Sequence, residues 1–298
     1  MNYEIRKIVV PVDFSPVSLN ALHSAIAICR RQLATLTLIH VIENAYIFLP
    51  PEAGGSAQSV LGDMVKEANE NLSRLAKDIR VKHDLVVSHQ VRSGNPADEI
   101  CRWALHKKID LIVMGTHGTS GLREFFIGSN AYRVVKNSSC PVLTIPGSEA
   151  WIEFKKILFP IRAFPRAMEK YEFIQPIVRE NKSNVLLAGV VSNRDVSELN
   201  EIKKLVGDIR NKLEADGTVC ESAVYSCDDV AQEVLKISTD VSPDLIVISV
   251  TLDTSIKDFF LGPFAQDIVN HAQYPVLSIR PGQVEQNKRL PKSQVEFT

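Results

Sequence analysis

The chain has 298 residues, of which 45% are hydrophobic, 23% charged and 7% aromatic. This is the composition of an ordinary globular protein, and it excludes the disordered, collagenous and small disulfide-stapled classes. The formal net charge of -1 at pH 7 argues against a dedicated nucleic-acid binder, because the domains of such proteins are usually clearly basic.

The charge is divided unevenly along the chain. Residues 1–147 carry 16 basic and 13 acidic side chains, whereas the remainder carries 18 and 22. The two halves therefore have opposite net charges. At about 150 residues per domain, the length itself predicts two domains.

The sequence pattern also bears on the compartment. No apolar run approaches the roughly 18 residues of a membrane-spanning helix, and residues 1–15 lack the apolar segment of a signal peptide. The five cysteines are scattered, and their spacings fit neither a redox nor a zinc motif. We therefore expect reduced cysteines in a cytoplasmic protein with no membrane or nucleic-acid partner.

The first elements follow one another closely. An apolar run at 8–12 predicts a strand, and a second strand is expected at 36–42. Between them, Ser15 and Pro16 supply an N-cap and a first-turn proline, which predict a helix to about Gln32.

The same alternation continues through the first half. Asn95 and Pro96 predict a second capped helix that runs to about Lys107. Short apolar runs follow at 111–114 and 141–146. Continuous apolar runs bounded by turn residues are typical of strands buried on both faces of a parallel sheet.

The second half repeats the first. The matching segments are KIVVPVD (7–13) with KILFPIR (156–162), LTLIHVI (36–42) with VLLAGVV (185–191), DLIVMG (110–115) with DLIVIS (244–249), FFIG (125–128) with FFLG (259–262), and CPVLTI (140–145) with YPVLSI (274–279). The offset changes from 149 to 134 between the second and third strands. We attribute this change to a Pro/Gly-rich loop at 49–55 of the first copy.

Two copies of one domain explain these matches. Each copy is expected to be an α/β domain with an open, doubly wound, five-stranded parallel sheet. We expect the first domain at 1–147, the second at 153–281 and a flexible tail at 282–298. Ligands of such sheets bind beyond the carboxyl ends of the strands, where the strand order reverses.

A glycine-rich segment follows the strand at 111–114. Gly115 and Gly118 come first, and Gly128 and Ser129 begin a helix to about Lys136. Glycines allow close approach of the backbone to a ligand, and amides at a helix N-terminus favour an anion. The segment is therefore suited to phosphate, although tight turns alone would also explain its glycines.

The spacing Gly-x2-Gly-x9-Gly-Ser resembles the nucleotide motif of the universal stress protein family. Three further segments resemble strands of that family: IVVPVDFS (8–15), HVI (40–42) and PVLTIP (141–146). The resemblance implies a tandem member whose domains have the α/β fold expected above. It also implies an adenine nucleotide ligand, ATP or else ADP or AMP, with Mg²⁺ able to accompany the phosphates.

The resemblance implies roles for particular residues. Asp13 would accept hydrogen bonds from the ribose or base, Val41 would line the adenine pocket, and the glycines with Ser129 would hold the phosphates. The expected site comprises Pro11, Val12, Asp13, Val41, Met114, Gly115, His117, Gly118, Gly128, Ser129 and Asn130. His117 is expected to be a solvated or phosphate-adjacent loop residue, since no acid or nucleophile is identifiable beside it. We expect no catalytic residue and no dedicated metal site.

The second copy departs from the motif. Arg162 stands in place of Asp13, Ser249 of Gly115, Leu252 of Gly118 and Pro263 of Ser129. Because an arginine cannot accept hydrogen bonds and a proline has no amide hydrogen, we expect no ATP there. Its expected role is structural, as a partner that pairs with the first copy through the last strands; Arg162 facing an anion is the alternative. A homodimer of the whole chain is also compatible with the sequence.

Three functions are compatible with the sequence. The first, which we favour, is a nucleotide-binding regulatory protein of the stress response with little or no turnover. The second is a slow ATPase or nucleotidyl-transfer enzyme, although no P-loop, SGGxDS or HxGH signature occurs. The third is a dimerisation module that binds no nucleotide.

Overall fold

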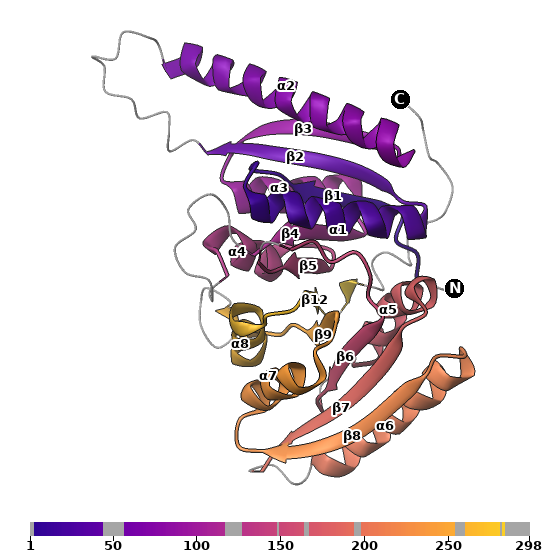
Figure 1. The fold of residues 1–298 in the computed structure, drawn as a ribbon. Coiled ribbons are helices and arrows are strands. Elements are labelled where there is room, and N and C mark those ends of the chain that lie inside the picture. The colour runs from indigo at the N-terminus through magenta and orange to yellow at the C-terminus, as the bar shows by residue number, and fades with distance from the viewer. Residues whose placement is uncertain are drawn as a thin grey trace.

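The computed structural model describes residues 3–43, 57–116, 127–147, 149–163, 167–193, 198–253, 260–280 and 282–283. The first repeat alternates strands and helices from its first element to its last (Figure 1). In chain order its elements are β1 (Lys7–Pro11), α1 (Pro16–Gln32), β2 (Thr35–Glu43), α2 (Ala57–His83), β3 (Val87–Gly94), α3 (Pro96–Lys107), β4 (Leu111–Gly115), α4 (Ser129–Asn137) and β5 (Val142–Ile145).

The second repeat follows the same order, with one short addition before its last helix. Its elements are β6 (Lys156–Ile161), α5 (Ala167–Asn181), β7 (Asn184–Ser192), α6 (Glu198–Ala215), β8 (Cys220–Cys227), α7 (Val230–Val241), β9 (Leu245–Ser249), β10 (Leu252–Asp253), β11 (Phe260–Leu261), α8 (Pro263–His271) and β12 (Val276–Ile279). The antiparallel pair β10–β11 has no counterpart among the elements that the sequence predicts.

The two repeats share one ten-stranded sheet with the order β3-β2-β1-β4-β5-β12-β9-β6-β7-β8 (Figure 1). Within this sheet the strands of each repeat are parallel, whereas β5 and β12 pair antiparallel, with Thr144 opposite Val276 and Leu143 opposite Leu277. The Thr144 hydroxyl also donates to the Val276 carbonyl at 3.2 Å. The last strands therefore join the repeats into one continuous sheet.

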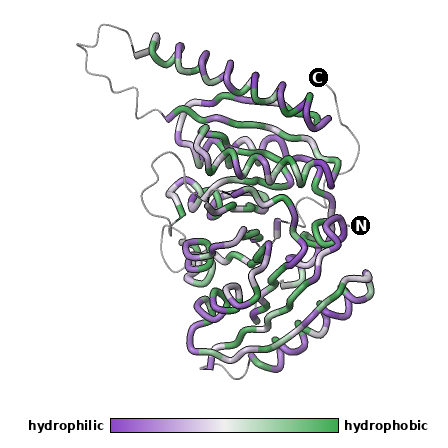
Figure 2. The backbone as a smooth tube through the Cα atoms, viewed as in Figure 1, coloured by the Kyte–Doolittle hydropathy of each residue, from purple (hydrophilic) through white to green (hydrophobic). Residues whose placement is uncertain are grey.

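Helices cover both faces of the sheet, as the continuous apolar runs predict. Alternate residues of β1 enter opposite cores: Ile8 and Val10 pack with α1 and α2, while Val9 packs with α3 and α4. Figure 2 shows hydrophilic and hydrophobic residues alternating along the helices, the pattern of helices with one face on a sheet. The doubly wound α/β fold is confirmed.

Two predicted helix starts are also confirmed. The Ser15 hydroxyl accepts a hydrogen bond from the Ser18 amide at 3.2 Å, and α1 begins at Pro16. The Asn95 side chain accepts one from the Asp98 amide at 3.3 Å, ahead of α3. A side chain that satisfies a first-turn amide in this way fixes where the helix begins.

The length difference between the repeats has a second contribution. The expected cause, the loop at 49–55, lies outside the described residues. The structure also places part of the extra length in a helix, since α2 has 27 residues and its counterpart α6 has 18. A longer amphipathic helix and a longer loop look alike when only the offset between matching strands is known.

The expected tail begins with a packed residue. Gln283 is only 5% exposed, and its side-chain amide donates to the Ser138 carbonyl at 3.0 Å. The expectation of a flexible tail thus falls on residues 284–298, which lie outside the described part of the chain.

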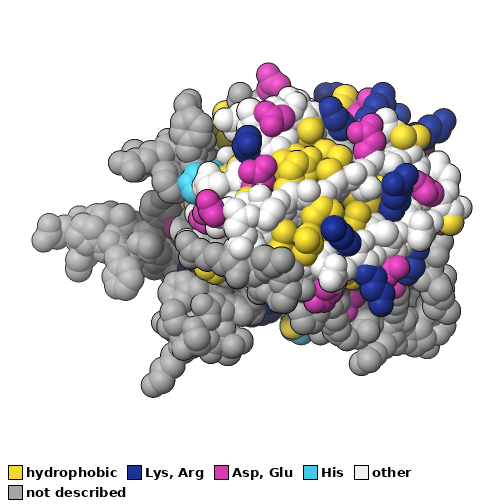
Figure 3. Space-filling view, turned by 90° about the horizontal axis from the view of Figure 1, so that it is seen from below, with side chains coloured by type: hydrophobic (Ala, Val, Ile, Leu, Met, Phe, Trp, Pro, Cys, Tyr) yellow, Lys and Arg dark blue, Asp and Glu magenta, His cyan; other side chains and the backbone are white. Residues whose placement is uncertain are grey.

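The edge strand of the second repeat, β8, has hydrophobic side chains that are partly exposed. Figure 3 shows hydrophobic side chains on this side of the molecule with charged residues around them. Val224 of the edge strand β8 is 37% exposed, and Val219 just before it is 63% exposed. Within the described chain β8 pairs on one side alone, with β7.

Candidate ligand-binding site

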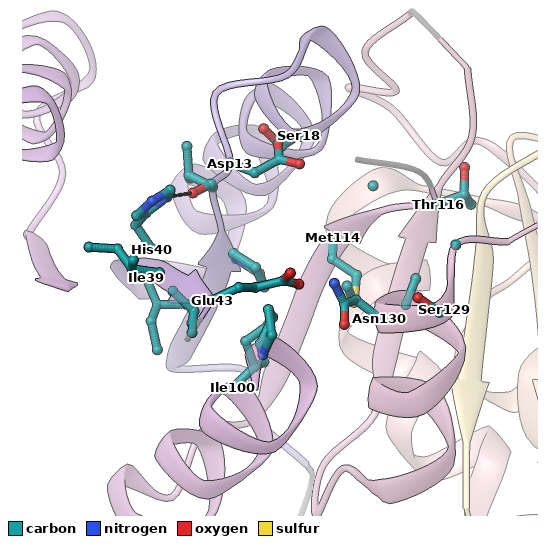
Figure 4. Close-up of a pocket in the computed structure, with 18 of the residues that line it drawn as sticks. Asp13, Ser18, Ile39, His40, Glu43, Ile100, Met114, Thr116, Ser129 and Asn130 are labelled. Atoms are coloured by element: carbon teal, nitrogen blue, oxygen red, sulfur yellow. Dashed lines mark hydrogen bonds between the residues drawn. The ribbon is translucent and has the colours of Figure 1, made fainter. Parts of the chain in front are cut away.

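A pocket of about 360 Å³ lies at the carboxyl ends of β1, β2 and β4 in the first repeat (Figure 4). The strand order reverses between β1 and β4, because the chain moves outward to β2 and β3 before it returns. This is the place where open α/β sheets bind their ligands.

The pocket brings together most of the expected site residues. Those that line it are Pro11, Val12, Asp13, Val41, Met114, Gly115, Gly128, Ser129 and Asn130. The other two, His117 and Gly118, lie outside the described residues. The structure adds further lining residues, some of them from α1, α2 and α3, which the motif does not cover: Ser18, Ile39, His40, Ile42, Glu43, Met64, Pro96, Ile100, Thr116 and Ala131.

The N-terminus of α4 forms one side of the pocket. Gly128 is its N-cap and donates its own amide hydrogen to the Thr116 carbonyl at 2.6 Å, which ties α4 to the end of β4. Unlike α1 and α3, α4 has no side-chain cap among the described residues. Its first-turn amides are therefore the natural donors for an anionic group in the pocket.

Gly115 is required by packing as well as by the pocket. A Cβ atom at this position would lie 2.7 Å from Cγ1 of Val17 and 3.1 Å from the Val17 carbonyl carbon. The first turn of α1 thus crosses the end of β4 too closely for a side chain. This contact holds the two elements that bound the pocket against each other.

Asp13 lies at the turn between β1 and α1. Its Oδ1 atom accepts hydrogen bonds from the Ser15 amide at 3.0 Å and the Ser15 hydroxyl at 2.6 Å. Phe14 between them has a φ of 64°, which makes the turn tight. Asp13 therefore stabilises the start of α1 and also presents its carboxylate to the pocket.

The opposite wall combines apolar and polar groups. Val41 and Ile39 of β2 and Ile100 of α3 line it together with Glu43, whose carboxylate reaches into the pocket in Figure 4. Nδ1 of His40 lies 2.6 Å from the Val12 carbonyl, which fixes the imidazole at the end of β1. An apolar wall opposite helix amides suits a ligand with a flat apolar part and an anionic part.

The corresponding place in the second repeat is nearly closed. Arg162 occupies the position of Asp13 and Phe264 that of Asn130, by the repeat offsets. The cavity that remains beside them is about 20 Å³. Val190, the counterpart of the half-buried Val41, is accordingly only 1% exposed.

Three further observations on the described residues concern metal binding, membrane spanning and the reactivity of the cysteines. They contain no group of three or more His, Cys, Asp or Glu side chains placed to hold a metal ion. None of the helices in this part of the chain has the length and apolarity needed to cross a bilayer. All five cysteines are free, and burial raises the pKa of the Cys29 and Cys140 thiols to about 12, so these two are unreactive core residues.

The model of the universal stress protein family matches the chain twice, over residues 4–146 and 153–280. The chain therefore belongs to the universal stress protein family, as a member with two tandem domains. It is 36% identical over 141 residues to universal stress protein MJ0531 of Methanocaldococcus jannaschii, an alignment that covers 47% of this chain and 81% of the relative. It is 30% identical over 146 residues to universal stress protein YxiE of Bacillus subtilis, covering 47% of this chain and 98% of the relative.

Solved structures share the arrangement of the whole chain. A universal stress protein from Archaeoglobus fulgidus has a TM-score of 0.75 at 16% identity, covering 94% of this chain and all of the other. A universal stress protein from Pseudomonas aeruginosa, called putative in its description, has a TM-score of 0.63 at 15% identity, with 96% and 98% covered. At these identities the likeness shows the fold.

Proposed function

We propose that the first repeat binds an adenine nucleotide, ATP or else ADP or AMP, and that the protein is a nucleotide-binding regulator of the stress response. One observation carries the proposal. Nine residues chosen from a nucleotide motif and its flanking strands line a single pocket of about 360 Å³ at the point where strand order reverses.

Each side of the pocket has a role in this proposal. The uncapped first-turn amides of α4 and the Ser129 hydroxyl hold the phosphates. The Asp13 carboxylate accepts hydrogen bonds from the ribose hydroxyls, and Val41 packs against the adenine ring. Mg²⁺ would be bound through the phosphates, because the described chain has no dedicated cluster of ligands for it.

The proposed role is binding with little turnover. Nδ1 of His40, the only imidazole on the described lining, lies 2.6 Å from a backbone carbonyl and so helps to hold the pocket wall. Asp13 is engaged by Ser15 at the helix start. These contacts suit residues that shape a pocket better than residues that transfer protons.

Titration calorimetry of the full chain with ATP, ADP and AMP, with and without Mg²⁺, tests the proposal. We expect one nucleotide site per chain. A phosphate-release assay on the same sample should give less than one turnover per minute. The absence of binding at millimolar nucleotide would favour a dimerisation module, turnover of several per second would favour an enzyme, and two equivalent sites would contradict the assigned asymmetry.

A further inference from the structure

The second repeat contains a buried cation where the first has a core alanine. Lys170 of α5 is 4% exposed, the most buried of the charged side chains that the structure describes. Its counterpart by the offset of 149 is Ala21 of α1, which is fully buried in the hydrophobic core. Burial of an ammonium group is unfavourable unless nearby groups compensate its charge.

Lys170 does not lie among apolar groups alone. Its ammonium group donates to the Pro160 carbonyl and lies 4.1 Å from the centroid of the Phe159 ring. It also borders the cavity of about 20 Å³ that remains at the carboxyl ends of β6 and β9. The other residues that line this cavity are Pro160, Ile161, Arg162, Ser249, Thr251 and Phe264.

The cavity has an excess of positive charge. Lys170 forms no salt bridge within the described part of the chain, and the charged group that acts most strongly on it is Arg162. The nearby Glu198 carboxylate in turn favours the charged form of the Arg162 guanidinium. Burial and the nearby guanidinium lower the pKa of Lys170 to about 7, and burial lowers the pKa of Arg162 as well. Among the described residues, two cations thus line this poorly solvated space, and Glu198 is the one carboxylate that acts on either of them.

The size of the cavity limits what could balance these charges. A single water needs about 10–15 Å³ of such space, so a volume of about 20 Å³ accepts one particle of similar size. A nucleotide cannot enter. Ser249 and Thr251 add two hydroxyl groups to the lining, and hydroxyls can donate hydrogen bonds to an anion.

We propose that the second repeat binds one small inorganic monovalent anion, of the size of chloride, between the Lys170 ammonium and the Arg162 guanidinium. The hydroxyls of Ser249 and Thr251 complete its surroundings. The second repeat is then a small-anion site at the same sheet edge where the first repeat has its larger pocket. This proposal is independent of nucleotide binding in the first repeat.

Thermal unfolding of the full chain tests the proposal at pH 6.5, in sodium chloride against sodium gluconate of equal ionic strength. An anion that binds the folded state alone stabilises it with the logarithm of its concentration. We expect Tm to rise by about 2–4 °C for each tenfold increase in chloride above its dissociation constant. The Lys170→Met variant should lose this dependence. The matched control is Lys236→Met, which removes a charge from a side chain that is 69% exposed on α7.

A second measurement needs no variant. Crystals of the wild-type chain soaked in sodium bromide should show an anomalous peak in contact with Lys170 and Arg162. A wild-type Tm equal in chloride and gluconate, an unchanged chloride dependence in Lys170→Met, or no bromide at this position would each overturn the proposal. Should Lys170→Met fail to fold, Arg162→Gln replaces it, since Arg162 lies at a strand end and is only partly buried.

Discussion

The guanidinium carbon of Arg162 lies 4.4 Å from the centroid of the Phe264 ring. The residues at the same two positions of the first repeat, Asp13 and Asn130, line an open pocket and are both polar. A cation over an aromatic ring is attractive by about 0.5–2 kcal/mol, more where water is excluded. In the second repeat, the contact between Arg162 and Phe264 therefore fills the place where the first repeat has an open pocket. This pair distinguishes the two copies of the fold.

The Asn130→Phe variant should make the first repeat resemble the second. The ring would occupy the pocket beside the N-terminus of α4, so we expect nucleotide affinity to fall at least tenfold, or about 1.4 kcal/mol, by calorimetry. Folding should be retained because the second repeat accommodates Phe264 at this position. Phe264→Asn is the matched control and should leave nucleotide affinity unchanged. Equal affinities for Asn130→Phe and the wild type would mean that the nucleotide lies elsewhere.

Gly115 should be sensitive to the smallest addition. In Gly115→Ala the new Cβ would lie 2.7 Å from the Val17 side chain, and relief requires a shift of α1 against β4. We expect a loss of about 1–3 kcal/mol in the free energy of unfolding, measured with urea. Gly207→Ala is the control, since a Cβ there meets nothing within 4 Å on helix α6. It should stabilise the protein by about 0.5–1 kcal/mol; a similar loss in both variants would refute the packing argument.

The parts of the fold that the sequence predicts well are those with local causes. Ser15 and Asn95 cap helices within three residues of themselves, so their pattern can be interpreted without knowing the tertiary structure. The matches between the two copies indicated that the chain contains one domain twice. The convergence of Glu43, Met64 and Ile100 on one pocket depends on how three separate elements pack, and no local pattern indicates it.

The surroundings of Lys170 and Phe264 could not be predicted from the local sequence pattern. A lysine in an amphipathic helix is ordinarily assigned to solvent, because burial of an ammonium group is unfavourable. Only the offset between the repeats, which aligns Lys170 with the buried Ala21, could have indicated that this lysine is buried. In the same way, the offset of 134 aligns Phe264 with Asn130. The glycine motif alone does not indicate that an aromatic ring stands at this position of the second repeat.

Asp13 should have two separable roles. Asp13→Asn keeps an Oδ1 atom that can accept hydrogen bonds from Ser15, so stability should change by less than about 0.5 kcal/mol. It removes the carboxylate from the pocket, and the loss of a charge-assisted hydrogen bond should weaken nucleotide binding roughly tenfold. Asp13→Ala should lose both, with about 1 kcal/mol less stability from the weakened helix start. If Asp13→Asn binds nucleotide as the wild type does, the carboxylate does not contact the ligand.

The buried Lys170 should make stability depend on pH in a defined direction. Its pKa is lowered in the folded protein from 10.5 to about 7. Between these values the unfolded chain binds more protons than the folded one, so stability rises with pH across this window, by up to about 1.4 kcal/mol per pH unit. Above pH 10.5 the lysine is neutral in both states and the penalty is absent.

Lys170→Met should therefore be more stable than the wild type at pH 7, with the gain shrinking steadily toward pH 10. Urea unfolding in gluconate buffers at pH 7, 8.5 and 10 measures this difference without a small anion present. The Lys236→Met variant should show no such trend, because the side chain of Lys236 is 69% exposed and carries no burial penalty. A constant difference between Lys170→Met and the wild type across this range would show that the ammonium is hydrated in the folded protein, since burial, ahead of the charge of Arg162, is the main cause of its lowered pKa.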